Sequence, residues 1–319
     1  MINLLKNKVQ EIPVFFATDD NYIPFLDVAL RSLIENASKK YRYRIIILNT
    51  GLQKDSMSKI KDLEDKNFKI DFYDISAYFD EVRNKLRNVF HFGLATYYRL
   101  FIERLFPQYS KVIYLDCDIV VLGDISELYN IDMKGNLLAG SIERFVATTS
   151  EFRNYTQTVL GIDCMNYINA GVLLMNLDEI RKVEIERQFL EILNKYNFKS
   201  IAPDQDYLNF LCKDRILYLP SGWNKTPLAS VECEGKMNIV HYALVKKPWQ
   251  YDDVLYGEYF WQYAEKSPFY REIVLKKQNF TEEDKLKKEK ANVDIIELAN
   301  EISASDNTFY KKLVLQIEG

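Results

Sequence analysis

The feature that most constrains this chain is an apolar stretch, residues 111–122 (KVIYLDCDIVVL), which carries two acids in its interior, Asp116 and Asp118. Such a β-branched run predicts a buried strand, yet Asp is depleted in strands and a buried, unpaired carboxylate is costly. Residues i and i+2 of an extended segment point to the same side, so the two carboxylates are expected to converge. The pattern predicts a positive group at that point, and a divalent metal ion is the simplest candidate.

The rest of the chain alternates short apolar runs with segments of helical spacing. Strands are predicted at residues 12–17, 43–48, 69–73, 111–122, 170–175 and 238–242, and helices at 25–34, 54–63, 94–105, 184–196, 204–211, 293–302 and 309–317. This alternation indicates an α/β fold with a largely parallel, doubly wound sheet. Ligands bind beyond the carboxyl ends of the strands in such sheets. Asp19 and Asp20 follow the first strand, so we expect them to share a cleft with Asp116 and Asp118.

Composition narrows the class of protein. The 319 residues are 48% hydrophobic and carry a formal net charge of −4, which gives no indication of a nucleic acid partner. No window approaches the roughly 18 apolar residues of a membrane span, and the four cysteines have no C-x-x-C spacing. A cytoplasmic protein with reduced thiols is therefore expected. The lack of a P-loop or a G-x-G-x-x-G loop argues against a standard nucleotide-binding loop of either kind.

The composition changes from about residue 267. Residues 281–290 are densely charged, which is typical of a solvated helix face, and the acids among the lysines weaken the alternative of a membrane-surface patch. We therefore predict a main domain at residues 1–265 and a small helical appendage at residues 266–319. The appendage is a candidate for homodimer formation or for peripheral contact with a membrane.

The chain has two histidines, and their predicted roles differ. A lone histidine after an apolar strand, such as His241, is more often a satisfied core residue than a ligand. Joined to two carboxylates, however, its imidazole would favour Mn²⁺ over Mg²⁺. His91 lies in a Phe-rich loop and is predicted to be structural.

Three other polar positions are equally open. Asp204 and Asp206 suit the first turn of a helix, which leaves Gln205 unexplained. Residues 169–171 (NAG) form either a turn or a place where a ligand approaches the backbone. Arg99, in a predicted helix, is either a surface charge or a partner for pyrophosphate.

Six segments taken together resemble glycosyltransferase family 8, the retaining nucleotide-sugar enzymes of the GT-A fold. They are residues 16–22 (FATDDNY), 96–100 (TYYRL), 114–119 (YLDCDI), 167–176 (YINAGVLLMN), 204–209 (DQDYLN) and the pair 241–242 (HY) with 247–249 (KPW). Each segment alone is weak, but six in the family's order and spacing over residues 12–250 are specific. The likeness is greatest to bacterial transferases that build lipopolysaccharide, capsule or glycoprotein glycans.

The resemblance implies roles for individual residues. Asp116, Asp118 and His241 would ligate Mn²⁺, with Mg²⁺ as the alternative, and Lys247 would hold a phosphate of a UDP-sugar. The other residues implied to bind the donor are Ala17, Thr18, Asp19, Asn21, Tyr22, Arg99, Cys117, Asn169, Ala170 and Gly171. The residues implied to act at the reacting carbon of the sugar are Asp204, Gln205 and Asp206. One position departs from the family pattern, because Leu244 stands where many members have a glycine beside the diphosphate.

The implied activity is transfer of glucose or galactose from a UDP-sugar to a hydroxyl of a surface-glycan, lipid-linked or glycoprotein acceptor. The anomeric configuration would be retained, and the enzyme would work in the cytoplasm or at the inner face of the membrane. Front-face attack needs no protein base and is favoured. Gln205 is a poor nucleophile, so Asp206 is the candidate for a double displacement.

Three alternatives stay open. Residues 116–120 (DCDIV) also fit the signature of haloacid-dehalogenase-like phosphatases, with Asp116 as nucleophile and Asp118 as general acid. That motif normally opens its fold, yet about 110 residues precede it here, and it gives no role to His241. The second alternative is a non-catalytic nucleotide-sugar-binding protein, and the third is an enzyme that glycosylates one of its own tyrosines.

Overall fold

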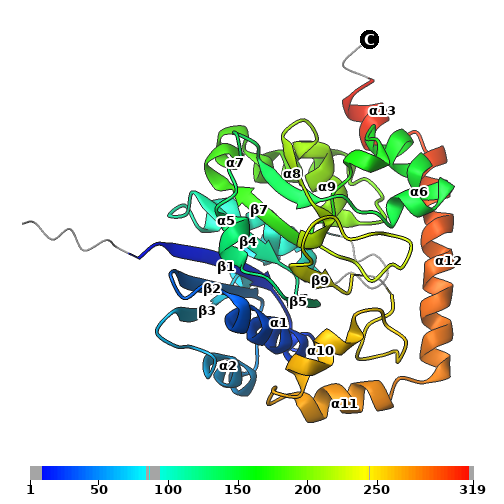
Figure 1. Cartoon of the computed structure of the whole chain (residues 1–319). Coiled ribbons are helices and arrows are strands. Elements are labelled where there is room, and N and C mark those ends of the chain that lie inside the picture. Colours follow the sequence, from blue (N-terminus) through cyan, green and yellow to red (C-terminus); the bar gives the residue numbers. More distant parts are fainter. Residues whose placement is uncertain (1–8, 84–85, 87–93, 244, 316–319) are drawn as a thin grey trace, which may run out of the picture.

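The computed structural model describes residues 9–83, 86, 94–243 and 245–315, and a seven-stranded sheet lies at its centre (Figure 1). The strands follow the order β3-β2-β1-β4-β7-β6-β8. Strands β3, β2, β1 and β4 are parallel, β7 is antiparallel to β4 and β6, and β8 is parallel to β6. The strands are β1 Glu11–Ala17, β2 Arg42–Asn49, β3 Phe68–Asp74, β4 Lys111–Leu115, β6 Leu138–Ser141, β7 Val172–Asn176 and β8 Ile216–Leu219. The mixed, mainly parallel sheet confirms the predicted fold class.

Alternating side chains of the central strands build a hydrophobic core on each face of this sheet. In β1, Phe15 belongs to one core, whereas Val14 and Phe16 belong to the other. Successive side chains of a strand point to opposite faces, so a strand buried on both faces is apolar throughout. The helices of the first half are α1 Ile23–Asn36, α2 Lys54–Lys61, α3 Ser76–Arg83, η1 Leu94–Phe101, α4 Ile102–Leu105, α5 Ile125–Tyr129 and α6 Ser150–Tyr155. Those of the middle are α7 Leu177–Val183, α8 Ile185–Tyr196 and α9 Pro203–Cys212.

The stretch at residues 111–122 is not one strand, which corrects our prediction. Strand β4 ends at Leu115, and a new strand, β5 Ile119–Val121, pairs with β9 Ile239–His241 in a separate two-stranded sheet. Asp116 and Asp118 therefore lie in the connection between two sheets, and they are not residues i and i+2 of a single strand. The pattern concealed this break because the residues of both strands are almost entirely buried.

The predicted helix at residues 94–105 also differs from expectation. Residues 94–101 form the 3₁₀ helix η1, and only residues 102–105 are α-helical. A 3₁₀ helix of this length is uncommon, and such segments often mark functional sites or strain. Here η1 carries Arg99 into the interior, where it is 2% exposed.

The C-terminal part consists of α10 Gly257–Ala264, α11 Tyr270–Gln278, α12 Glu282–Ala304 and α13 Phe309–Leu313. The densely charged segment is the first half of α12, which starts with a capping box formed by Thr281 and Asp284. Helix α12 runs along one side of the molecule, from α11 to α6 (Figure 1). Ile302 of α12 and Phe309 of α13 belong to the same core as Phe15, so these helices pack on the main domain. The boundary at residue 265 stays a prediction.

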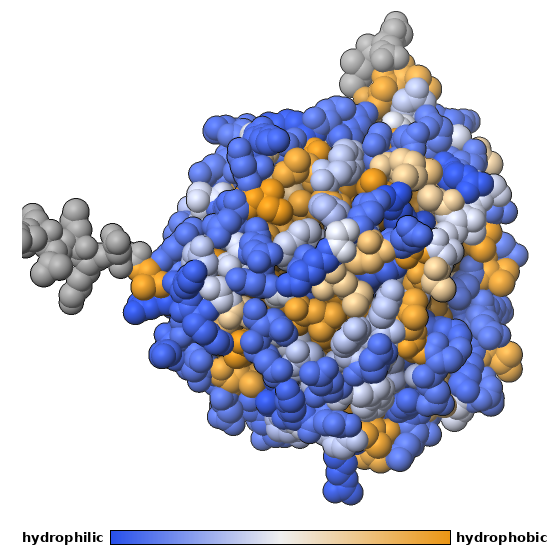
Figure 2. Space-filling model, viewed as in Figure 1, coloured by the Kyte–Doolittle hydropathy of each residue, from blue (hydrophilic) through white to orange (hydrophobic). Residues whose placement is uncertain are grey.

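The surface on this side is mostly hydrophilic (Figure 2). Hydrophobic residues gather near its centre and along the side where α12 lies (Figure 2). Leu286 and Val293 of α12 are 64% and 55% exposed. Within the described part of the chain, none of the helices combines the length and the apolarity that crossing a membrane requires.

Candidate functional site

A cavity of about 640 Å³ opens beyond the carboxyl ends of β1 and β4, the edge of the sheet at which α/β proteins bind ligands. Its lining includes most of the predicted site residues, namely Ala17, Asp19, Tyr22, Arg99, Asp116, Cys117, Asp118, Asn169, Ala170, Gly171, Asp204, Gln205, His241 and Lys247. Thr18, Asn21 and Asp206 are described by the structure but do not line this cavity. Leu244 and His91 lie outside the described residues.

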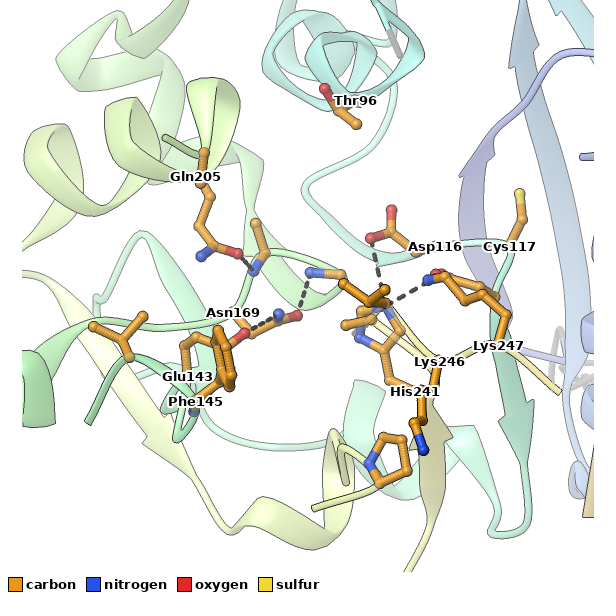
Figure 3. Close-up of a pocket in the computed structure, with 18 of the residues that line it drawn as sticks. Thr96, Asp116, Cys117, Glu143, Phe145, Asn169, Gln205, His241, Lys246 and Lys247 are labelled. Carbon is orange, nitrogen blue, oxygen red and sulfur yellow. Dashed lines mark hydrogen bonds and ion pairs between the residues drawn. The ribbon is translucent and has the colours of Figure 1, made fainter. Parts of the chain in front are cut away.

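Three side chains in this cavity form a candidate metal site. One ligand atom each from Asp116, Asp118 and His241 lies within 4.8 Å of the others. His241 Nε2 is 3.2 Å from Asp118 Oδ1 and 3.8 Å from Asp116 Oδ2 (Figure 3). Two carboxylates and one imidazole suit Mn²⁺ and other borderline divalent ions. The donor set therefore fits a metal, and the rest of the coordination shell would come from water or a ligand.

Lys247 supplies a positive charge to the same cluster. Its Nζ lies 2.6 Å from Asp118 Oδ2 and also donates to the carbonyl of Tyr242. Burial opposes ionisation of Asp118, but the ammonium group of Lys247 outweighs it and holds the pKa of this carboxyl well below its usual range. Asp118 is therefore ionised at neutral pH, as a metal ligand must be.

Arg99 orients the other carboxylate. Its Nη2 donates to Asp116 Oδ1 over 2.9 Å, its Nη1 donates to the carbonyl of Ala170, and its guanidinium lies 4.3 Å from the ring centre of Tyr114. Tyr114 also donates its hydroxyl to Asp116 Oδ1, at 3.0 Å. Oδ1 of Asp116 is therefore occupied, whereas Oδ2 faces His241. The guanidinium of Arg99 donates hydrogen bonds to Thr96, Ala170 and Asp116, which are protein groups. Its contact with a donor sugar therefore stays a prediction.

Gly171 lets the backbone pass directly beside the metal ligands. A Cβ atom at this position would lie 2.1 Å from His241 Cε1 and 2.6 Å from Asp116 Oδ2. The Gly171 carbonyl accepts a 2.8 Å hydrogen bond from the Asp116 amide, so the backbone cannot easily withdraw. The sequence left residues 169–171 open as either a turn or a place where a ligand approaches the backbone. In the structure, the groups that lie against Gly171 are the side chains of Asp116 and His241.

The segment after β1 lies beside the metal cluster only in part. Ala17, Asp19 and Tyr22 line the cavity, and Cys117 Sγ donates to the Ala17 carbonyl at 3.2 Å. Asp19 Oδ1 accepts hydrogen bonds from the amides of Asn21 and Tyr22 and so fixes the turn into α1. The Thr18 side chain is buried, donates to the carbonyl of Asp19 and lies within hydrogen-bond reach of Cys117, so its contact with a ligand stays a prediction.

The helix α9 contributes two residues to the cavity and a third to its support. Gln205 Oε1 accepts from the amide of Ala170 at 2.9 Å, and its Nε2 donates to the hydroxyl of Tyr167 at 3.1 Å. Asp204 Oδ2 lies 3.0 Å from Arg99 Nε, although that N–H is directed to the Thr96 carbonyl. Burial raises the pKa of Asp204, and the charge of Arg99 opposes the shift.

Asp206 occupies a different environment from its neighbours. It is fully buried behind the cavity wall, where the hydroxyls of Tyr155, Tyr167 and Ser200 donate to its carboxylate at 2.5–2.6 Å. Burial raises its pKa, and these hydrogen bonds oppose the shift. A carboxylate held in this way cannot reach a sugar in the cavity, so the suggestion of Asp206 as a nucleophile is wrong for this conformation.

Some site residues had no signal in the sequence. Asn224 Oδ1 lies 2.9 Å from His241 Nδ1, and Glu143 lines the cavity near Asn169 (Figure 3). Asn292 and Ile295 of α12 also line the cavity, so the C-terminal part contributes directly to its wall. Each of these residues comes from a segment without a recognisable motif.

Comparison with known proteins places the chain in a family. The model of glycosyl transferase family 8 matches residues 13–253. A Haemophilus influenzae protein with a provisional glycosyltransferase name is 30% identical over 219 residues, which cover 68% of this chain and 64% of that protein. This chain therefore spans less than two thirds of that relative's length. The lipopolysaccharide 1,2-glucosyltransferase of Escherichia coli K12 is 26% identical over 76% of this chain and 74% of that enzyme.

Solved structures agree with this match. The galactosyltransferase LgtC, in complex with donor and acceptor sugar analogues, has a TM-score of 0.69 and 27% identity, covering 81% of this chain and 96% of its own. The bifunctional glycosyltransferase WbbM has a TM-score of 0.75 but 24% identity over 86% of this chain and 53% of its own, so it supports the fold alone. These matches favour a transferase over a haloacid-dehalogenase-like phosphatase. The chain therefore belongs to glycosyltransferase family 8 and has the GT-A fold.

Proposed function

We propose that this protein transfers a hexose, glucose or galactose, from a UDP-sugar to a hydroxyl group, with Mn²⁺ and with retention of the anomeric configuration. The observation that carries the proposal is the convergence of Asp116, Asp118 and His241 ligand atoms within 4.8 Å, beside Lys247, in a large cavity. Family membership supplies the general class, a transferase that uses a nucleotide sugar and a divalent metal. The choice of UDP, hexose and Mn²⁺ is our proposal.

The residues around the cluster suit a donor diphosphate. A bound divalent metal supplies Lewis-acid stabilisation of charge on the departing diphosphate. Lys247 is 5% exposed and close enough to Asp118 to place its ammonium beside the same phosphates. Ala17, Asp19 and Tyr22 line the adjoining wall and are the proposed contacts for uracil and ribose.

The sugar would lie against the wall formed by Asn169, Ala170, Asp204 and Gln205. Gln205 is fixed by hydrogen bonds at both ends of its amide, so it can orient a sugar without becoming a nucleophile. Asp206 is withdrawn behind the wall. This arrangement favours front-face transfer over double displacement.

In front-face transfer, the bond between the anomeric carbon and the phosphate oxygen breaks while the acceptor oxygen forms its bond on the same face. The proton of the acceptor hydroxyl passes to the departing phosphate oxygen, and UDP leaves. Lys247 would stabilise the negative charge that develops on this oxygen, and Asp204 and Gln205 would hold the sugar in place.

The acceptor is proposed to be a surface-glycan, lipid-linked or glycoprotein hydroxyl. The named activity of the E. coli relative, a lipopolysaccharide glucosyltransferase, supports this class. Work in the cytoplasm or at the inner membrane face, and a homodimer through the C-terminal helices, are proposals that accompany it.

A panel of UDP-sugars and other nucleotide sugars, each with Mn²⁺, Mg²⁺ or EDTA, tests the proposal by the release of the nucleotide. We expect one UDP-hexose to be hydrolysed slowly without an acceptor, and EDTA to abolish the release. Asp118→Asn should lose at least about 100-fold in rate because it removes a metal ligand. Asp252→Asn is the matched control, because Asp252 is 95% exposed and pairs with Lys277 at the surface.

Each alternative has its own outcome in this assay. Hydrolysis of simple phosphate esters, with an aspartyl-phosphate at Asp116, would refute the proposal in favour of a phosphatase. Tight UDP-sugar binding without turnover, across a panel of acceptors, would indicate a non-catalytic binding protein. Sugar found on a tyrosine of the protein itself would indicate self-glycosylation. Full activity of Asp118→Asn and His241→Ala would contradict the assigned metal ligands.

A further inference from the structure

A chain of buried hydrogen bonds joins the metal-ligand cluster to a carboxylate on the cavity wall. His241 Nδ1 lies 2.9 Å from Asn224 Oδ1, Asn224 Nδ2 lies 2.8 Å from Asn169 Oδ1, and Asn169 Nδ2 lies 2.5 Å from Glu143 Oε2. None of these four side chains is more than 7% exposed. Glu143, Asn169 and His241 all line the cavity, and Figure 3 shows Glu143 beside Asn169 with His241 near them. Water therefore cannot easily replace any of the links.

The chain of hydrogen bonds has one consistent direction. An ionised carboxylate only accepts, so the group that Asn169 turns to Glu143 must be its Nδ2. The Gly171 amide donates to Asn169 Oδ1 at 2.9 Å, which fixes the same orientation independently. Asn169 Oδ1 in turn requires a donor from Asn224. This requirement directs the amide nitrogen of Asn224 to Asn169 and its oxygen to His241.

This direction determines which ring nitrogen of His241 carries the proton. An amide oxygen only accepts, so the proton of a neutral imidazole must be on Nδ1. The lone pair of the ring is then on Nε2, which is the nitrogen that lies 3.2 Å from Asp118 Oδ1. In the other tautomer, Nε2 would carry a hydrogen that Asp118 Oδ1 could accept in the metal-free protein, but Nε2 could not bind a metal and two acceptors would face each other at Nδ1.

We propose that Glu143, Asn169 and Asn224 are positioning residues that hold His241 in the Nδ1-protonated tautomer and thereby present Nε2 as a metal ligand. Outer groups of this kind commonly set the orientation and basicity of a metal-bound histidine. Here the outer group is the amide of Asn224. Its orientation is set through Asn169 by the Glu143 carboxylate on the cavity wall. The metal part of this proposal rests on the proposed function, whereas the tautomer does not.

The tautomer of His241 can be measured directly by NMR in protein that keeps all four residues of the hydrogen-bond chain. The chain has two histidines, so ¹⁵N-histidine labelling in a His91→Gln background leaves His241 as the one imidazole signal. In metal-free protein at pH 8, two-bond ¹⁵N–¹H correlations should identify Nδ1 as the protonated nitrogen. Asn224→Ala should shift the signal toward the Nε2-protonated form. A wild-type ring protonated on Nε2 would overturn the proposal, whatever the transferase activity proves to be.

Metal affinity supplies a second readout that does not depend on turnover. The amplitude of the free Mn²⁺ EPR signal, recorded without donor, should show about 10–100-fold weaker binding by Asn224→Ala. Asn238→Ala is the matched control, because Asn238 is equally buried next to β9 and its Oδ1 has no hydrogen-bond partner among the described residues. This control should remain within about 3-fold of wild type.

The carboxylate tests the far end of the chain. Glu143→Gln keeps an oxygen that can accept from Asn169, so this variant should retain most of the Mn²⁺ affinity. Glu143→Ala removes that oxygen and should lose Mn²⁺ affinity. This pair decides the question if Asn224→Ala does not fold. Folded Asn224→Ala or Glu143→Ala with wild-type Mn²⁺ affinity would overturn the positioning role. A wild-type protein that binds no divalent ion would refute the metal site, and the tautomer measurement would then decide the hydrogen-bond chain alone.

Discussion

Gly171→Ala is the smallest change that the structure predicts to be severe. The added Cβ would lie 2.1 Å from His241 Cε1 and 2.6 Å from Asp116 Oδ2. Ordinary contacts between carbon atoms are about 3.5–4.0 Å, so the imidazole would have to move by more than ~1 Å. The backbone of residue 171 cannot retreat, because its amide donates to Asn169 Oδ1 at 2.9 Å and its carbonyl accepts from the Asp116 amide at 2.8 Å.

The displacement exceeds what a metal site tolerates. Ligand distances must hold within about 0.2 Å, so a shift of ~1 Å removes His241 from the coordination shell. We expect Mn²⁺ affinity to fall at least about 100-fold and turnover to fall with it. Overpacking of a buried position costs about 1–3 kcal/mol, so the free energy of unfolding should fall by a similar amount.

Calorimetric Mn²⁺ titration and thermal unfolding with and without Mn²⁺ measure both effects. Gly257→Ala is the matched control, since its Cβ would lie 3.5 Å from the nearest atom, an ordinary contact, at the start of α10. That variant should keep wild-type Mn²⁺ affinity, and its melting temperature should be unchanged or slightly raised. Folded Gly171→Ala with wild-type Mn²⁺ affinity and turnover would refute the close-packing argument.

Three further predictions concern the core, the charges and the donor. Phe309→Ala should lower the free energy of unfolding by about 3–5 kcal/mol in urea titrations, because the ring is fully buried against Phe198 and Tyr207. Leu286→Ala, at the exposed face of α12, should change it by less than ~0.5 kcal/mol. Equal effects of the two substitutions would contradict the packing of α13 on the main domain. The pKa of Asp118 is lower in the folded protein than the value of about 3.9 in the unfolded chain, so its ionised form stabilises the metal-free protein above about pH 3.9, and this contribution is lost as the pH falls toward the folded pKa. The difference in free energy of unfolding between wild type and Asp118→Asn should therefore be largest near pH 6 and should narrow below about pH 4. A difference that does not depend on pH would contradict the ion pair. UDP should raise Mn²⁺ affinity, and Mn²⁺ should raise UDP affinity by the same factor, about 10-fold or more in calorimetry; independent binding would contradict a shared site.

Short apolar runs and helical spacing predicted the regular elements well where burial follows a simple rule. Strands β1 and β2 and helix α1 lie within one or two residues of their predicted bounds. Strands β6 and β8 were missed because each has only four residues, and LAGS in β6 has little β propensity. The break at Asp116 was missed because strands buried on all sides carry no alternation that could reveal a change of sheet.

The candidate site was predictable to the extent that its residues occur in recognisable segments. Asp116, Asp118 and His241 lie together as the resemblance implied. Asn224 was missed because it lies 17 residues before His241, directly after the 3₁₀ helix Ser221–Trp223, and the bridge between Lys225 and Val240 brings the two together. Such a contact depends on the path of a loop, which hydrophobic periodicity does not encode.

The charges around the cluster explain how metal and donor depend on each other under the proposed function. Asp116 pairs with Arg99 and Asp118 with Lys247, so these two ion pairs together have no net charge. A divalent cation alone would leave two positive charges in a buried region, and a dianionic diphosphate alone would leave two negative charges. Both together restore neutrality, which matters most where the effective dielectric constant is low. If Asp118 ligated a metal ion, its carboxylate would no longer be available to pair with Lys247. A phosphate oxygen of the donor could then become the anionic partner of Lys247.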